Sequence, residues 1–326
     1  MVSGVTGFLG GRVASELART GHQVVGFCRD ASRWNKRPAS AAVVTGDVTD
    51  RAAVEHAVDG CDAAIHAAAL VKTWVRDKRQ FDRVNVEGLG YVIGACRDRG
   101  VRLVYISSFI ALGPTDGTTL DENSPRVDKN FHNDYERTKW LGDQLARNAS
   151  DRGLDLVRVY PGVIFGPGAL THGNHLVKLL LQHARGKLPG MLGRGDLRQC
   201  FAFVDDVAAG VVAALERGKA GEGYILGGEN RTGIELFDAF QAASGVAPPK
   251  RKIPFGVASA IGTVQRWRAE LFGIEPELTD EIVGIYRHEW AYRSDKAIAE
   301  LGYRITPFAE AIDRTVAWLR ESGELA

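Results

Sequence analysis

The stretch Met1-Val2-Ser3-Gly4-Val5-Thr6-Gly7-Phe8-Leu9-Gly10 sets three glycines directly behind a short apolar segment. Residues 8–19 then show helical periodicity, and residues 24–28 form an apolar run typical of a strand. Glycines between a strand and a helix permit a tight turn and close approach of a dinucleotide pyrophosphate, whose charge faces the helix N-terminal amides. Without this context they would indicate only a glycine-rich turn. We expect cofactor contacts from Gly4, Thr6, Gly7, Phe8, Leu9 and Gly10.

The strand–helix alternation continues as far as residue 165. Strands are expected at Val43–Val44, Ala63–Ala67, Val101–Ile106 and Leu156–Val159, with helical stretches between them. This rhythm is typical of a parallel sheet with helices on both faces and a ligand crevice at the carboxyl ends of the strands. We therefore predict an α/β chain with a Rossmann-type doubly wound parallel sheet.

The rhythm breaks after Gly166-Pro167-Gly168. We expect residues 1–167 to form the dinucleotide-binding domain, rejoined by a helix and a strand at about 201–228. Residues 168–200 and 229–326 would then form a smaller, mainly helical substrate domain. Within it, Gly245 and Gly302 should end helices, and Thr306-Pro307 should start the last one.

The predicted first strand is short, because only three residues precede the glycine loop, whereas strands usually have about 5 residues. Two explanations remain open, a start site placed too late or a strand that is clipped.

Composition narrows the class of partner. The 326 residues carry a net charge of +1 with mixed signs along the chain, so no basic stripe predicts nucleic-acid binding. Four distant cysteines without a CxxC pair predict neither a zinc site nor a disulfide framework. His172 and His175 lack a third ligand nearby, so no metal is expected. The chain opens without a signal segment, and its run at residues 253–265 is too short to span a bilayer. We expect a cytoplasmic monomer or homodimer with a small-molecule substrate.

Tyr135-Glu136-Arg137-Thr138-Lys139 places a tyrosine one helical turn before a lysine, on the same face. A tyrosine ordinarily has a pKa of about 10, and a neighbouring cation favours its phenolate. Ser108 follows an apolar strand upstream. We expect Tyr135 to carry the proton, Lys139 to favour its ionisation, and Ser108 to donate a hydrogen bond to the substrate oxygen. Such a pair alone is common on helix surfaces, but with the glycine loop it indicates hydride-transfer chemistry.

Cofactor preference is predicted from the end of the second strand. A carboxylate there commonly binds the ribose 2′-hydroxyl of NAD, but this chain has Cys28 followed by Arg29. Arginine can bind a 2′-phosphate in a forked geometry, so we expect NADP, with NAD as the alternative because Asp30 is adjacent. Asp47 and Val48 are expected beside the adenine, and Ala67, Ala68 and Ala69 beneath the ribose.

Asn85 lies in the stretch Val84-Asn85-Val86. A helix-borne amide at this place can hold a water against Lys139 and so connect the tyrosine to solvent. The alternative is an ordinary amide on a helix surface.

Several motifs resemble the extended short-chain dehydrogenase/reductase family, and the similarity runs from end to end. They are TGFLGG, GDVTD, HAAAL from His66, VNVEG from Val84, YISSF from Tyr105, YERTK, YPGVIFGPG from Tyr160 and FVDDVAAG from Phe203. Within the family the chain looks most like plant dihydroflavonol-reductase-like enzymes, in particular farnesol dehydrogenases. Further matching stretches are SSFIALGPTDG, NDYERTK, GKLPGMLGRGD and RHEWAYRSDKAIAELGY.

This resemblance implies a Ser108–Tyr135–Lys139 triad with Asn85 as a fourth member. Pro161 and Val163 would border the nicotinamide. It also implies an NAD(P)-dependent oxidoreductase that interconverts an alcohol and a carbonyl on an apolar, isoprenoid- or polyphenol-like substrate.

One departure concerns nucleotide-sugar epimerases of the family, which usually carry an asparagine where this chain has Val163. A side chain that would hydrogen-bond a diphosphate is therefore missing, although Arg198 could still bind a phosphate. A nucleotide-sugar epimerase or dehydratase remains the alternative. A non-catalytic dinucleotide sensor is a third class, but such proteins typically lose the YxxxK pair.

Apolar side chains follow the strands that should face the crevice. Those expected to contact substrate are Leu70, Trp74, Phe109, Ile110, Leu170 and Met191. Trp267 and Leu271 either roof this cleft or, as we favour, belong to an ordinary core between domains.

Overall fold

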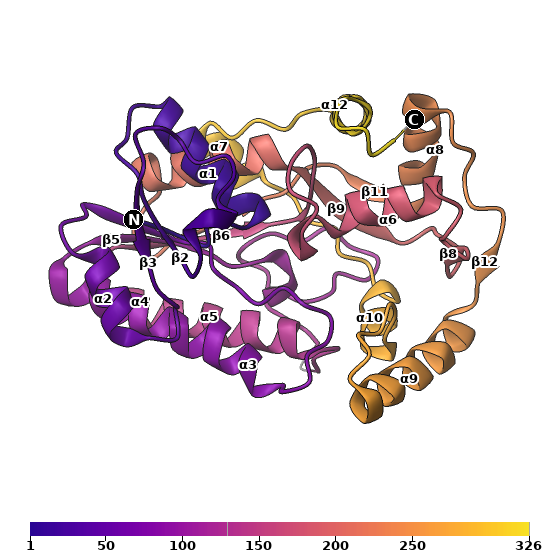
Figure 1. Cartoon of the computed structure of the whole chain (residues 1–326), viewed down its shortest axis with the longest axis horizontal. Helices are drawn as coiled ribbons and strands as arrows, with labels where there is room; N and C mark the ends of the chain where they lie inside the picture. The colour runs from indigo at the N-terminus through magenta and orange to yellow at the C-terminus, as the bar shows by residue number, and fades with distance from the viewer. Residues whose placement is uncertain (129, 326) are drawn as a thin grey trace.

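The computed structural model describes residues 1–128 and 130–325, and a seven-stranded sheet lies at its centre (Figure 1). All neighbouring strands in this sheet run parallel. In spatial order they are β10 (Gly223–Leu226), β6 (Leu156–Pro161), β5 (Arg102–Ile106), β4 (Ala63–His66), β1 (Val2–Ser3), β2 (Val25–Cys28) and β3 (Ala42–Thr45). The predicted doubly wound α/β fold is confirmed, and so is the return of a strand at 223–226 to the sheet.

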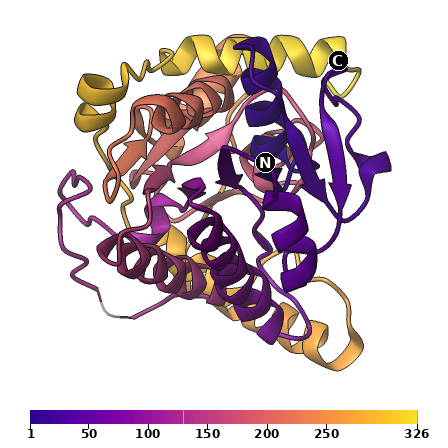
Figure 2. The ribbon, with the colours of Figure 1, turned by 90° about the vertical axis from the view of Figure 1, so that its left-hand side faces the viewer.

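Helices cover both faces of the sheet, and Figure 2 shows the same layers after a quarter turn. Apolar side chains from the helices of each face pack on the strands, which gives one hydrophobic core per face. The first face carries α1 (Phe8–Arg19), α7 (Val204–Arg217) and α11 (Asp295–Leu301). The second carries α2 (Arg51–Val58), α4 (Gly88–Arg99) and α5 (Asp134–Asp151).

Strand β1 has only two residues, yet it occupies a central place in the sheet. Val2 is in register with Gly26 of β2 on one side and with Ile65 of β4 on the other. The amide of Gly4 extends this pairing by donating to the carbonyl of Phe27 at 3.1 Å. Hydrogen bonds on both sides therefore hold this short strand in place.

The smaller part of the molecule is built on two further sheets and a phenylalanine-rich core. One sheet orders β11 (Asn230–Thr232), β9 (Arg198–Phe203) and β7 (Val163–Phe165), and the other pairs β12 (Lys252–Ile253) with β8 (Met191–Leu192). Helices α6 (His175–Ala184), α8 (Gly233–Ser244) and α12 (Phe308–Glu321) pack around the first. His172 and His175 lie in a 3-10 turn and at the start of α6, as expected.

The helix-ending glycines behave as predicted, whereas the last helix begins one residue later than expected. Gly245 and Gly302 are left-handed, at φ +82° and +64°. Pro307 caps α12 in place of Thr306. The reason is that Asp206 of α7 accepts hydrogen bonds from the Thr306 amide at 2.7 Å and hydroxyl at 2.8 Å.

Helices α9 (Phe255–Phe272) and α10 (Asp280–Tyr286) pack on each other at the edge of the molecule (Figure 1, lower right). The preference for a core position of Trp267 and Leu271 is wrong, because these side chains are 57% and 74% exposed. No helix within residues 1–128 and 130–325 is long and apolar enough to cross a membrane.

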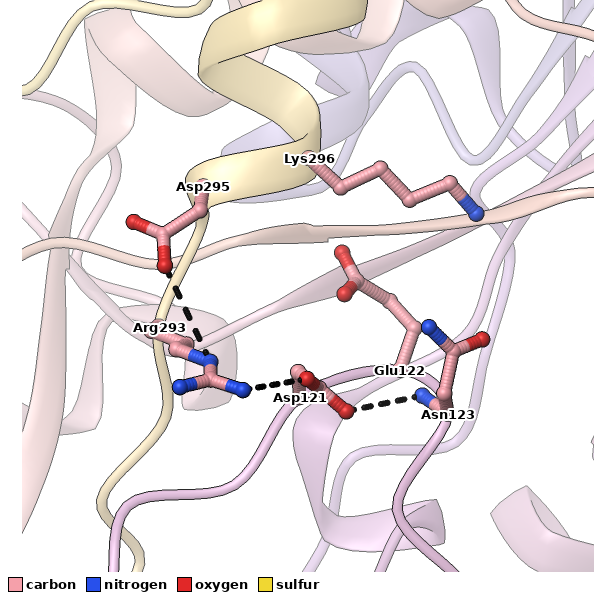
Figure 3. A pocket seen from close by; sticks show the side chains of 6 residues that line it. All are labelled: Asp121, Glu122, Asn123, Arg293, Asp295 and Lys296. Carbon is pink, nitrogen blue, oxygen red and sulfur yellow. Dashed lines mark hydrogen bonds and ion pairs between the residues drawn. The ribbon is translucent and has the colours of Figure 1, made fainter.

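A small polar hollow lies where the segment Asp121–Asn123 meets Arg293–Lys296 (Figure 3). Arg293 pairs with Asp121 at 2.6 Å and with Asp295 at 3.7 Å. Glu122 accepts a hydrogen bond from the amide of Ile225 in β10 at 2.7 Å. Lys296 pairs instead with Glu222, outside the hollow, at 2.6 Å. The hollow thus anchors the long segment after β5 to the far edge of the sheet.

Candidate active site

Helix α5 carries both Tyr135 and Lys139. Its start is fixed by Asn133, whose side chain accepts a hydrogen bond from the amide of Glu136 at 2.8 Å. Tyr135 therefore lies in the first turn and Lys139 one turn later on the same face. The Lys139 ammonium is buried and donates to the carbonyl of Ile106, at the end of β5, at 2.9 Å.

Burial shifts the pKa values of Tyr135 and Lys139 in opposite directions. It lowers the pKa of Lys139 to about 7 and raises the pKa of Tyr135 to about 12, while a hydrogen bond with the Ser108 side chain acts on Tyr135 in the opposite direction. Without cofactor the tyrosine is thus a protonated phenol. A nearby positive charge would bring its pKa toward the working range.

Ser108 lies between β5 and the 3-10 turn η3 (Phe109–Ala111), which its hydroxyl caps by accepting from the Ile110 amide at 3.4 Å. The structure brings Ser108, Tyr135 and Lys139 together at the carboxyl end of β5, where a parallel sheet binds ligands. Their catalytic roles remain predictions.

Asn85 is buried rather than on a helix surface, within the π-helical segment η2 (Arg83–Glu87) between α3 (Arg79–Asp82) and α4. Its carbonyl oxygen accepts from the Leu70 amide at 2.7 Å, and its amide donates to the Leu70 carbonyl at 3.3 Å and to the Thr138 hydroxyl at 3.0 Å. Both donor protons are therefore engaged, which leaves only a lone pair of the oxygen for the water predicted here. Asn85 ties the loop after β4 to helix α5.

A second buried network, which the sequence analysis missed, holds the same loop. The Ser3 hydroxyl accepts from the amides of Ala67 at 3.1 Å and Ala68 at 3.2 Å. Since both its lone pairs are then used, it donates its proton to Nδ1 of His66, 2.9 Å away. Burial lowers the pKa of His66 to about 3, so the ring is neutral with its proton on Nε2. The signal in the sequence is a hydroxyl directly before the glycine loop and a histidine directly before three alanines.

The glycine loop fits a dinucleotide pyrophosphate. Gly4 has φ +75°, and a Cβ there would lie 2.8 Å from the Ala68 amide nitrogen. A Cβ on Gly10 would lie 2.3 Å from the Gly4 carbonyl oxygen. Gly7 precedes α1 without any side-chain cap, so the first-turn amides face the loop, where an anion is stabilised. Thr6 lies in the loop, and Phe8 and Leu9 begin α1, with Phe8 buried; their contact with the cofactor remains a prediction.

The charged residues after β2 differ in whether their side chains are already engaged in hydrogen bonds or ion pairs. Asp30 accepts hydrogen bonds from the Ser32 amide at 3.0 Å and hydroxyl at 2.6 Å, which hold the pKa of this carboxyl below its usual value. It thereby caps the turn η1 (Ala31–Arg33). The Arg29 side chain is 76% exposed, and its ion pair with Asp47 is long, at 3.9 Å. Its guanidinium is therefore accessible to a phosphate. Exposed Arg33, which the sequence analysis did not single out, lies four residues on.

The remaining residues predicted to contact the cofactor lie at the same edge of the sheet. Asp47 binds the amide of Thr49 at 3.0 Å, directly after β3. The carbonyl of Val48 would lie 3.2 Å from a Cβ on Gly88, which brings the start of α4 close. Pro161 ends β6 and Val163 begins β7, next to Phe201 of β9.

The six predicted substrate residues fall into two groups. Phe109, Ile110 and Met191 are buried, and Phe109 packs edge-on against Trp290 at 5.6 Å and Tyr292 at 5.8 Å. Leu70, Trp74 and Leu170 are half-buried. Their contact with substrate remains a prediction, and the sequence analysis missed the two aromatic partners of Phe109.

The guanidinium of Arg198, considered above for phosphate, is already paired. It meets the carboxylate of Glu289 at 3.0 and 2.9 Å and donates to the Thr118 carbonyl at 3.1 Å. The hydrogen bond from Arg198 lowers the pKa of Glu289 to about 2, so this ion pair persists across the working pH range.

Comparisons with known proteins agree with this geometry. A model of the NAD-dependent epimerase/dehydratase family matches residues 1–227. A putative dihydroflavonol 4-reductase from Synechocystis is 28% identical, covering 99% of this chain and 94% of the relative. A 2-alkyl-3-oxoalkanoate reductase from Stenotrophomonas maltophilia is 31% identical, covering 93% of each chain. The crystal structure of gox2253 has a TM-score of 0.83 at 32% identity, covering 100% of this chain and 98% of that one. The resemblance read from the motifs is confirmed: the chain belongs to the NAD-dependent epimerase/dehydratase family of extended short-chain dehydrogenases/reductases.

Proposed function

We propose that this protein is an NAD(P)-dependent alcohol dehydrogenase or carbonyl reductase acting on an apolar substrate. The observation that carries the proposal is the convergence of Ser108, Tyr135 and Lys139 at the carboxyl end of β5, beside the glycine cradle. The smaller part of the chain, residues 168–200 and 229–326, would bind the substrate.

In the reducing direction Tyr135 donates its phenolic proton to the substrate carbonyl oxygen, and Ser108 holds that oxygen by a hydrogen bond as negative charge develops on it. Lys139 in its charged form stabilises the phenolate left behind. The bound nicotinamide cofactor supplies or accepts the hydride. Oxidation of an alcohol uses the same groups in reverse.

Three features support an apolar substrate. Val163 offers no hydrogen bond where a sugar-nucleotide enzyme usually has an amide, and Arg198 is committed to Glu289. One relative is named a putative dihydroflavonol 4-reductase and another a 2-alkyl-3-oxoalkanoate reductase, and neither name refers to a sugar nucleotide. A nucleotide-sugar epimerase is the second candidate, because the family itself is named for that activity.

NADP is the proposed cofactor, with NAD as the alternative. Arg29 is accessible, whereas the carboxylate of Asp30 is turned back onto Ser32. A forked guanidinium binds a 2′-phosphate, while an NAD site needs a free carboxylate for the 2′-hydroxyl.

The test is a series of alkyl and prenyl alcohols, their carbonyl forms and sugar nucleotides, assayed by reduced-nicotinamide absorbance with both cofactors. Each buried methylene should contribute about 0.8 kcal/mol, so kcat/KM should rise roughly fourfold per methylene until the pocket is filled. Tyr135→Phe should lower turnover roughly 10²- to 10⁴-fold while cofactor still binds. A flat series with turnover of a sugar nucleotide would favour the epimerase, and cofactor binding without any turnover would favour a sensor.

A further inference from the structure

Large apolar side chains are concentrated on helix α9 and the turn after it. Seven of the eleven exposed large apolar residues in the described part of the chain lie there: Val257, Ile261, Val264, Trp267, Leu271, Phe272 and Ile274. Their spacing of three, four and seven residues puts most of them on one helical face. We call this set the α9 face.

Another face of α9 makes the contacts within the molecule, and it uses small residues. Ala258, Gly262 and Ala269 are buried against α10, and a Cβ on Gly262 would lie 2.4 Å from the amide nitrogen of Asp280. Arg266 adds an ion pair with Asp280 at 2.8 Å. These contacts fix the rotation of α9, so its larger apolar side chains point to solvent.

Positive charge lies at both ends of helix α9 and on the helix itself. Five exposed basic residues near it make no ion pair in the described part of the chain: Arg76, Lys250, Arg251, Lys252 and Arg268. Most acidic groups nearby are neutralised instead, since Glu270 pairs with Arg266 at 3.3 Å and Glu275 with Lys72 at 3.8 Å. Among the described acidic residues between 270 and 281, Glu277 alone is exposed without a basic partner.

We propose that the α9 face docks reversibly on the surface of an anionic lipid bilayer. An apolar helix face flanked by basic residues and carrying a tryptophan is suited to the boundary between headgroups and acyl chains. Pairing of this face with the same face of a second copy would bring two positively charged surfaces together, which disfavours it.

Docking would also bring the lipid close to the predicted substrate loop. The Lys72–Glu275 pair ties the chain after α9 to the loop that carries Val71 and Trp74, and Val71 is itself 36% exposed. An apolar substrate dissolved in the bilayer would then reach the crevice from the membrane side. This consequence rests on the proposed function, whereas the docking does not.

The test is co-sedimentation of the full chain with vesicles of phosphatidylcholine containing phosphatidylglycerol, without cofactor or substrate. Leu271→Ser/Phe272→Ser should lower the bound fraction roughly tenfold or more, because it removes the two most exposed side chains of the α9 face. The matched control is Val127→Ser/Ile298→Ser, which removes two exposed apolar side chains elsewhere and should leave binding unchanged. Vesicles of pure phosphatidylcholine or high salt should also weaken binding.

Absence of wild-type binding, or an equal loss in the control, would overturn the proposal. So would a wild-type dimer, detected by light scattering, that Leu271→Ser/Phe272→Ser dissociates, because the face would then be an interface between copies. Turnover of a short water-soluble alcohol measured without vesicles separates the two proposals. It should be unchanged in Leu271→Ser/Phe272→Ser, whereas absence of turnover with every alcohol and carbonyl compound of the series above would refute the proposed function while leaving the docking result standing.

Discussion

Removing one partner of the Arg126–Glu136 ion pair should destabilise the fold far more than removing a surface pair. Nη2 of Arg126 lies 2.5 Å from Oε1 of Glu136, and the side chains are only 11% and 0% exposed. Loss of one partner leaves a buried charge uncompensated, which costs about 3–5 kcal/mol. We therefore expect Glu136→Leu and Arg126→Met each to lower the free energy of unfolding by that amount.

The same pair joins the two segments of the candidate site, the turn η3 after Ser108 and the helix α5 that carries Tyr135. Arg126 also donates to the carbonyl of Ile110 at 3.2 Å, just after Ser108, while Glu136 follows Tyr135 and accepts from the His132 amide at 2.8 Å. The single variants should therefore also lower kcat, since Ser108 and Tyr135, the proposed substrate-binding group and proton donor, lose their common support. The Michaelis constant for the cofactor should change little, because the glycine loop is not involved.

The assay is urea unfolding of both single variants and of Arg126→Met/Glu136→Leu, with Arg137→Met as the control. Arg137 pairs with Asp82 at 2.8 Å and with Asp134 at 3.1 Å, but these side chains are 21–37% exposed, so the control should cost at most about 1 kcal/mol for each pair. The double variant should recover much of the loss, since no lone charge stays buried. The reasoning would be refuted if each single variant lost no more unfolding free energy than Arg137→Met. It would also be refuted if the loss in the double variant equalled the sum of the two single losses.

Three further predictions concern the cofactor site. Arg29→Ala should weaken NADP(H) binding roughly 10- to 100-fold with little change for NAD(H), as expected of a charged hydrogen bond worth about 1.5–3 kcal/mol; equal losses in fluorescence titrations would contradict this. Burial lowers the pKa of Lys139 from 10.5 to about 7, so between these pH values the unfolded chain binds a proton that the folded chain lacks. The stability of the cofactor-free protein should therefore rise with pH across this window, and thermal unfolding of Lys139→Met should show a smaller rise; an unchanged slope would assign it to other groups. Gly10→Ala should abolish cofactor binding in the same titrations, because its Cβ would lie 2.3 Å from the Gly4 carbonyl oxygen, whereas Gly94→Ala, with nothing within 4 Å, should bind normally.

Local patterns were sufficient to predict the elements that frame the site. Helix α1 has the predicted bounds, because the glycine at its N-terminus and the apolar spacing along it are both local signals. The same holds for Lys139, whose helical spacing from Tyr135 places both on one face. The position of strand β1 could be predicted, but the sequence did not explain how so short a strand is held. Hydrogen bonds from both neighbouring strands hold its two residues, and no local pattern shows these bonds.

Buried polar contacts between distant segments were not predictable from patterns. Ser3 and His66 are 63 residues apart, and Asn85 and Thr138 are 53 residues apart. Residue types show that such groups can bond, but only the packed sheet shows which of them meet. The prediction of where α12 starts was wrong for the same reason. Thr306 bonds Asp206, which is 100 residues earlier in the chain.

Helix α9 shows a different limit of sequence reasoning. Periodicity shows that a helix has an apolar face, and such a face is stabilised by burial. It does not show whether the same protein or something else covers that face. Trp267 and Leu271 were therefore assigned to a core, since large apolar residues are usually buried. The structure instead buries Ala258, Gly262 and Ala269 and leaves the large side chains exposed. Small residues allow close packing with α10, and the face that remains is both apolar and bordered by unpaired basic groups. A partner must then satisfy both features at once, and an anionic bilayer does so.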